Sequence, residues 1–105
     1  MVFNTGAALL DAIVLAAVSK EAEGIYGYKI TQDVRKVIEI SESTLYPVLR
    51  RLQKDGCLEV YDREYGGRNR RYYQLTEDGK MQLKLYRKEW KTYSDKINAM
   101  FAEVE

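Results

Sequence analysis

An unbroken heptad pattern in the last quarter of the chain constrains its fold more than any other feature. Its apolar positions alternate between spacings of three and four residues: Leu83, Tyr86, Trp90, Tyr93, Ile97, Met100 and Val104. Such a seam is typical of a helix that packs along another helix, and it is narrower than the stripe that a helix buries in its own domain. The pattern predicts one long C-terminal helix and favours a partner helix on a second chain, with the seam as the dimer interface.

Two shorter helical patterns lie near the start of the chain. Over Thr5–Ser19, apolar residues recur at helical spacing among good helix formers, which predicts a first helix. The stretch Glu23–Gly27 contains two glycines and is predicted to be a loop. A second, short helix is expected over roughly Tyr26–Ile38, with Val37 on its apolar face.

A third helical pattern follows after a turn of only three residues, 39–41. Its apolar face consists of Leu45, Val48, Leu49 and Leu52. Gly56 closes its C-terminal end, and two short helices joined so tightly make a helix-turn-helix. Pro47 cannot donate a hydrogen bond within a helix, which favours Ser43 over Ser41 as the N-cap or else implies a local kink.

Beyond Gly56 the apolar period changes from 3.6 to 2 residues. Leu58 and Val60 before the segment 64–69, and Tyr73 and Leu75 after it, alternate with polar neighbours and mark the core side of two strands. This alternation predicts a β-hairpin with a glycine-containing tip. Thr76, followed by two acidic residues, suits the N-terminus of the final helix.

The chain is long enough for one hydrophobic core and too short for two ordinary domains, since it has 105 residues of which 46% are hydrophobic. The fold class is therefore mainly α with a small β-hairpin. A winged helix-turn-helix domain is expected at residues 1–76, and a dimerisation helix at residues 77–105 within the same structural unit.

Composition argues against an enzyme, a metal site or a cofactor site. Histidine is absent, and the single cysteine, Cys57, is predicted to be a half-buried residue at a strand start without a functional role. The apolar stretch Leu9–Val18 contains Asp11 and is far shorter than the roughly 20 residues of a membrane span. No basic residue precedes Lys20, so a signal peptide is not expected and the protein is predicted to be cytoplasmic.

The third predicted helix turns its leucines inward and leaves a polar and basic face. That face consists of Ser43, Thr44, Tyr46, Pro47, Arg50, Arg51 and Lys54. Hydroxyl groups can approach base edges or phosphates, and arginines can bind phosphate or pair bidentately with guanine. These residues are candidates for contact with a groove of double-stranded DNA.

The hairpin tip is the second candidate DNA contact. Its residues are Gly67, Arg68, Asn69, Arg70 and Arg71. Arginines can neutralise phosphates, and glycine lets the backbone pass close to a groove. From residue 43 to residue 76, seven basic residues oppose four acidic ones, so positive charge is concentrated at the predicted DNA face.

Two other interpretations stay open. The arginines of the hairpin tip can simply be solvent-exposed surface residues that keep the turn soluble and bind nothing. A winged helix can also be a protein-interaction or scaffolding module whose basic wing meets an acidic partner. The hydroxyl and basic groups of the third helix favour DNA, because a protein-binding face would favour exposed Leu, Met or Trp anchors.

Three stretches of the chain resemble the PadR-like transcriptional regulators. Residues 25–30, IYGYKI, are similar to the family's YGYEI, although Lys29 stands in place of the usual acid. Residues 43–56 match the TLYPxLxRLxxxG recognition helix almost throughout. Residues 67–76 resemble the GxRRKYYxLT wing, with Asn69 interrupting the arginine run.

The resemblance implies a homodimeric repressor that binds a double-stranded DNA operator, and it adds Tyr26, Tyr28 and Lys29 to the candidate DNA contacts. The chain is most similar to the short members with a single C-terminal dimerisation helix, the multidrug-responsive LmrR-like subset. Some of these bind flat aromatic drugs at the dimer centre between paired tryptophans. Trp90 occupies the matching position, with Tyr86 and Tyr93 a turn away on either side, which makes a planar aromatic effector a hypothesis. The alternative is that Trp90 only packs the dimer core.

Overall fold

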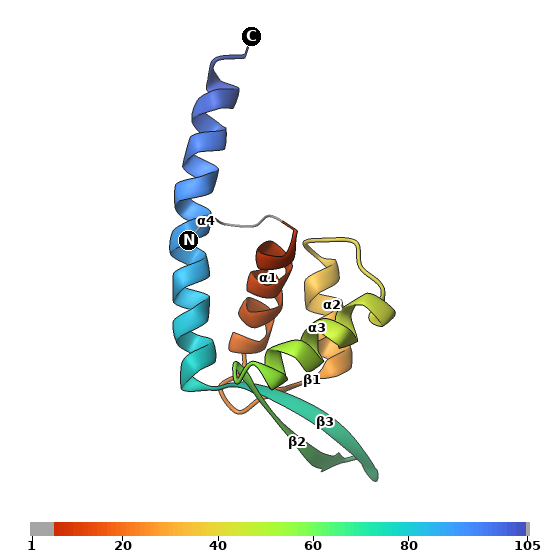
Figure 1. Ribbon diagram of the computed structural model, residues 1–105. Coiled ribbons are helices and arrows are strands. Elements are labelled where there is room, and N and C mark those ends of the chain that lie inside the picture. The colour runs from red at the N-terminus through yellow and green to blue at the C-terminus, as the bar shows by residue number, and fades with distance from the viewer. Residues whose placement is uncertain (1–5, 105) are drawn as a thin grey trace.

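Four helices and a three-stranded antiparallel sheet make up residues 6–104, the part of the chain that the computed structural model describes (Figure 1). The elements are α1 (Ala7–Ser19), β1 (Ile25–Tyr26), α2 (Gly27–Arg35), α3 (Glu42–Lys54), β2 (Leu58–Tyr65), β3 (Arg68–Leu75) and α4 (Glu77–Ala102). The predicted class, mainly α with a small β-hairpin, is confirmed. Thr5, the predicted first residue of the first helix, lies outside the described residues.

Helix α1 is the centre of the core. Val14, Leu15 and Val18 have no exposed surface, because α2, α3, β3 and α4 all contact this helix. Figure 1 shows α4 running alongside α1 and continuing well beyond it. In the part of the chain that the structure describes, no helix combines the length and the apolar character needed to cross a membrane.

The segment predicted to be a loop before the second helix contains a short strand. Ile25 and Tyr26 form β1, which pairs antiparallel with β3 opposite Tyr73 and Tyr72. The loop prediction was wrong at these two residues because β3 offers a free edge and Ile25 is buried against the core, at 3% exposure. A strand of two residues is too short to produce a recognisable alternation.

Helix α2 is shorter than predicted at both ends. It begins at Gly27, directly after β1, and ends at Arg35 instead of Ile38. The amides of Val37 and Ile38 both bond to the carbonyl of Val34, so the chain leaves the helix in a tight turn. Val37 was expected on the apolar face and is instead 70% exposed.

The N-cap of α3 is Ser41, and the preference for Ser43 was wrong. The Ser41 hydroxyl accepts a hydrogen bond from the amide of Thr44 at 3.3 Å, so the helix starts at Glu42 and Pro47 lies inside it. Ser43 and Pro47 are both exposed, which lets water replace the hydrogen bond that Pro47 cannot donate.

The hairpin is longer and tighter than predicted. Strands β2 and β3 pair as far as Tyr65 and Arg68, so only Gly66 and Gly67 form the turn. Both glycines have positive φ, 59° and 81°, as the two central residues of a type I′ turn require. Residues 68 and 69, expected in a loop, therefore lie on β3. Cys57 directly precedes β2 and is buried, not half-buried, and burial raises the pKa of its thiol.

Helix α4 is anchored at its start and projects at its end. The Thr76 hydroxyl accepts a hydrogen bond from the amide of Gly79 at 2.9 Å, which confirms the predicted cap. Leu83 and Tyr86, the first two positions of the heptad seam, pack against the core of their own chain. The far end of the same helix carries the large exposed side chains of Met100 and Phe101.

Replacement of Gly79 by Ala is expected to lower the free energy of unfolding by about 2 to 3 kcal/mol. A Cβ atom at this position would lie 2.1 Å from the carbonyl oxygen of Cys57, and backbone has to shift to relieve the contact. This cost exceeds the gain of about 1 kcal/mol from alanine's higher helix propensity. Thermal unfolding of Gly79→Ala, with Lys80→Ala as the exposed control, measures the difference. Equal stability of the two variants would contradict the tight contact.

Candidate nucleic-acid interface

The exposed face of α3 carries most of the side chains that the sequence assigns to DNA. Ser43, Thr44, Pro47, Arg50 and Lys54 are all exposed. Within residues 6–104, Arg50 and Lys54 make no ion pair, so both cations are available to an external anion.

Arg51 differs from its neighbour Arg50. Its guanidinium forms a two-pronged ion pair with the carboxylate of Asp11 on α1, with Nη1 donating to Oδ2 at 3.0 Å and Nη2 to Oδ1. The side chain of Asp11 is only 8% exposed, and its hydrogen bond to Arg51 raises the pKa of that guanidinium. Arg51 therefore fastens α3 to α1, while 46% of its side chain stays exposed.

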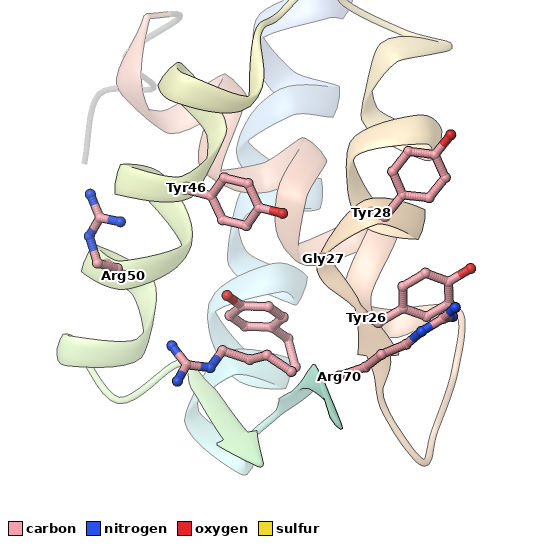
Figure 2. A pocket seen from close by; sticks show the side chains of 8 residues that line it. Tyr26, Gly27, Tyr28, Tyr46, Arg50 and Arg70 are labelled. Atoms are coloured by element: carbon pink, nitrogen blue, oxygen red, sulfur yellow. The ribbon is translucent and has the colours of Figure 1, made fainter. Parts of the chain in front are cut away.

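A cavity of about 640 Å³ opens between the start of α2, α3 and β3. Its walls are Tyr26, Gly27, Tyr28, Tyr46, Arg50, Arg70, Arg71 and Tyr73. Figure 2 shows Tyr46 reaching from α3 toward Gly27, with Tyr26 and Tyr28 on the far side. A Cβ atom on Gly27 would lie 3.0 Å from the Tyr46 hydroxyl, so glycine makes room for this approach.

The cavity brings together six of the predicted DNA contacts: Tyr26, Tyr28, Tyr46, Arg50, Arg70 and Arg71. Tyr73 was not among the predicted contacts, because alternation identified it only as a core residue of the hairpin. Tyr73 is 5% exposed and still lines the cavity. Burial raises the pKa of its phenol.

Arginine and tyrosine side chains interleave along the hairpin. The guanidinium of Arg70 lies 4.7 Å from the ring centres of both Tyr26 and Tyr65. Tyr61 stacks on Tyr72 with ring centres 5.7 Å apart, and Arg63 lies over the Tyr72 ring. Cation–π and stacking contacts each contribute about 0.5 to 1 kcal/mol at exposed positions, so this ladder stiffens the wing before any ligand binds. Tyr61 and Tyr72 lie opposite each other on the two strands of the hairpin, and this cross-strand pair was the feature of the sequence from which the stacking could have been predicted.

Lys29 is engaged within the domain. It donates to the carboxylate of Asp33 at 3.2 Å, and Lys20 and Lys36 approach the same carboxylate. Burial alone would raise the pKa of Asp33, but the hydrogen bonds from Lys29 and Lys36 and the charge of Lys20 hold it below its usual value. Lys29 thus neutralises a buried acid at the junction of α1 and α2, and is less available to DNA than Arg50.

A second, apolar pocket of about 390 Å³ lies between α1, the turn that follows α2, and α4. Ile13, Leu83, Tyr86 and Trp90 are among its walls. Trp90 is 42% exposed, and its ring centre lies 6.1 Å from that of Tyr93. The three aromatic residues of the effector hypothesis are therefore close together on one stretch of α4.

Comparison with known proteins identifies the family. The transcriptional regulator PadR-like family matches residues 14–85. A protein of known structure from Streptococcus mutans is 40% identical, with a TM-score of 0.87 over 98% of this chain and 95% of its own. A PadR-like transcriptional regulator from Bacillus cereus is 29% identical, with a TM-score of 0.82 over 92% and 94% of the two chains.

A transcriptional regulator from Mycobacterium tuberculosis is 40% identical over 60 residues, which is 56% of each chain. The family match spans the second part of α1, all of α2, α3 and the hairpin, and the start of α4, and so includes the cavity and the exposed face of α3. This chain belongs to the PadR-like family of DNA-binding transcriptional regulators.

Proposed function

We propose that the protein is a homodimeric repressor, in which residues 1–76 bind the operator and residues 77–105 supply the dimerisation helix. The observation that carries this proposal is the division of the surface. Basic and hydroxyl-bearing side chains gather on α3 and the hairpin, whereas large apolar side chains are exposed at the far end of α4. The first surface suits phosphate and base edges, and the second suits another apolar helix.

For DNA, the proposal places α3 in the major groove and the hairpin against the neighbouring backbone. On α3 the contacting residues are Ser43, Thr44, Pro47, Arg50 and Lys54. On the hairpin they are Gly67, Arg68, Asn69, Arg70 and Arg71. The exposed positions of these residues support the assignment, with Arg70 partly covered by its two tyrosine rings.

For the dimer, the proposal pairs the C-terminal part of α4 with the same helix of a second copy. Met100, Phe101 and Val104 are 70%, 67% and 71% exposed, and a cluster of this kind is costly in water. Together with Trp90, Tyr93 and Ile97 they give a continuous apolar ridge. Phe101 lies beside the heptad seam and widens it.

A gel-shift assay tests the proposed function. The purified protein is expected to retard the DNA upstream of its own gene in the presence of excess unrelated duplex. The position of the gene's promoter within the retarded fragment then links binding to repression. Retardation that unrelated duplex removes equally well would leave a non-specific binder and contradict the operator.

Arg68→Ala is expected to weaken binding to all sequences about equally and to reduce the salt dependence of binding. Each lost phosphate contact lowers the slope of log K against log salt by about 0.9, so a dimer should lose about 2 units. Lys96→Ala on α4 removes the same charge away from the wing and serves as the control. A slope that is unaltered in Arg68→Ala would show that the wing tip does not touch phosphate.

We also propose a planar aromatic cation as effector, stacked beside Trp90 at the dimer centre. The apolar pocket at Trp90 and the nearby Tyr93 ring support this. Cation–π attraction and stacking each contribute on the order of 1 kcal/mol per ring, so Trp90→Ala should weaken binding about ten- to a hundred-fold.

The effector is tested by titrating planar cationic dyes and following fluorescence of the single tryptophan. Calorimetry on Trp90→Ala, with light scattering to check that it is still a dimer, gives the loss of affinity. Binding that survives the substitution would leave Trp90 as a packing residue only.

A further inference from the structure

We propose that the cavity between α2, α3 and β3 receives one sugar–phosphate unit of the DNA backbone, and that the hydroxyl of Tyr73 donates a hydrogen bond to its phosphate. The inference rests on the DNA binding proposed above and names a specific contact within it. It also assigns a binding role to a residue that the sequence identified only as core.

The hydroxyl of Tyr73 is the first observation. The residue is 5% exposed, lines the cavity, and makes no hydrogen bond to any partner within residues 6–104. Its oxygen is not among the buried polar atoms that lack a partner, so the hydroxyl end of the side chain is open to the cavity although the residue as a whole is buried. Its neighbour Tyr72 points to the other face of the sheet, where its ring stacks on Tyr61. The cavity is therefore the side from which an acceptor can reach Tyr73.

The charge of the walls shows which acceptor fits. Arg50, Arg70 and Arg71 line the cavity together with four tyrosines, and no carboxylate is among its lining residues. Arg71 has only a long contact with Asp62, at 3.7 Å, and both side chains are about two-thirds exposed. A wall that contains three arginines and four tyrosines and no carboxylate favours an anion that accepts hydrogen bonds, such as a phosphate.

The position of the cavity favours DNA as the source of that phosphate. The walls belong to α3 and β3, the two elements proposed to contact DNA, and to the start of α2. A backbone strand that runs from the groove occupied by α3 to the wing must pass over this space. A volume of about 640 Å³ is larger than a bare phosphate needs, and the tyrosine rings offer flat walls to a deoxyribose.

The first test compares Tyr73→Phe with Tyr72→Phe. Each removes one phenolic hydroxyl from adjacent residues of β3, and only the first lies in the cavity. Tyr73→Phe is expected to weaken binding of the upstream DNA about ten-fold per protomer, because a hydrogen bond to a charged group is lost. It should weaken binding to an unrelated duplex equally, so the test remains decisive even if the operator itself is not found. Equal affinities of the two variants would overturn the proposal.

Stability of the free protein separates binding from folding. If the Tyr73 hydroxyl has no partner without DNA, Tyr73→Phe should unfold at the same denaturant concentration as the wild type, or at a higher one. A clear fall in stability, comparable to the loss in DNA affinity, would make the hydroxyl structural and overturn its assignment to DNA.

The second test neutralises single phosphates. Duplexes carrying one methylphosphonate at each successive position are expected to show one site per half-site where wild-type affinity falls and where Tyr73→Phe loses nothing further. If the loss caused by Tyr73→Phe adds fully to the loss caused by the methylphosphonate at every position, Tyr73 contacts no phosphate.

As a third test, a free deoxynucleoside 5′-monophosphate is titrated alone. It should not saturate below millimolar concentration, and Tyr73-dependent saturation at lower concentration would make a free nucleotide the occupant instead of DNA.

Discussion

Ile97→Asp is expected to convert the protein from a dimer to a monomer and to reduce operator affinity by on the order of 100-fold or more. In the proposed dimer the seam position of Ile97 faces the partner helix, so the substitution buries two like charges close to one another. An uncompensated buried charge costs several kcal/mol, which exceeds what a seam of this length can offset. A monomer can then bind only one half-site. It loses the gain in affinity that a dimer obtains because its second DNA-binding domain is linked to the first.

The control is Asn98→Asp, which adds the same charge one residue further along, on the outer face of α4. Light scattering at micromolar concentration gives the mass of each variant, and the gel shift gives its DNA affinity. A dimer mass and unchanged affinity for Ile97→Asp would place the dimer interface elsewhere on the molecule.

Two adjacent arginines of α3 are expected to give opposite results. Arg50→Ala should leave stability unchanged and weaken operator binding by roughly 1 to 3 kcal/mol, since Arg50 is exposed and has no ion pair within the described residues. Arg51→Ala should instead destabilise the fold, because it leaves the carboxylate of Asp11 buried without its partner. The expected cost is about 2 to 3 kcal/mol, less than for a fully buried pair, because Arg51 is itself 46% exposed.

Denaturant unfolding and DNA titration of both variants measure these effects, and Arg51→Lys adds a sharper comparison. Lysine keeps the charge but cannot form both hydrogen bonds to Asp11, so stability should recover only in part. If Arg51→Ala were fully stable and lost DNA affinity as Arg50→Ala does, Arg51 would be a DNA contact after all.

The periodicity of the chain was sufficient to predict the order of helices and the hairpin, because each element is long enough to repeat its pattern. It was insufficient for β1, whose two residues exist as a strand only because the edge of β3 is available to them. Ser43 was favoured as the N-cap of α3 because Pro47 cannot donate a hydrogen bond inside a helix. That loss costs less here, because Ser43 and Pro47 are both exposed to water.

The sequence was sufficient to predict most residues of the candidate site, but it was less informative about the role of each residue. Arg50 and Arg51 are identical in the sequence pattern, and only the packing of α1 under α3 brings Asp11, 40 positions away, to one of them. Tyr73 was identified as core because alternation reports which side of a strand is buried, and not whether a cavity reaches the end of the side chain. All positions of the heptad seam were expected to contact a partner chain, whereas Leu83 and Tyr86 pack against the core of their own chain.

The joint between the wing and α4 has a mechanical consequence. Thr76 alone separates β3 from α4, and its amide and hydroxyl are fixed to the carbonyls of Cys57 and Gly56 at the base of the hairpin. No flexible linker intervenes, so in the proposed dimer each DNA-binding domain is held rigidly on the paired α4 helices. The distance and phase between the two half-sites are then set by the register of one helix pair. One residue inserted into α4 would turn each DNA-binding domain by about 100°, and operators with altered spacing could not be accommodated by stretching the chain.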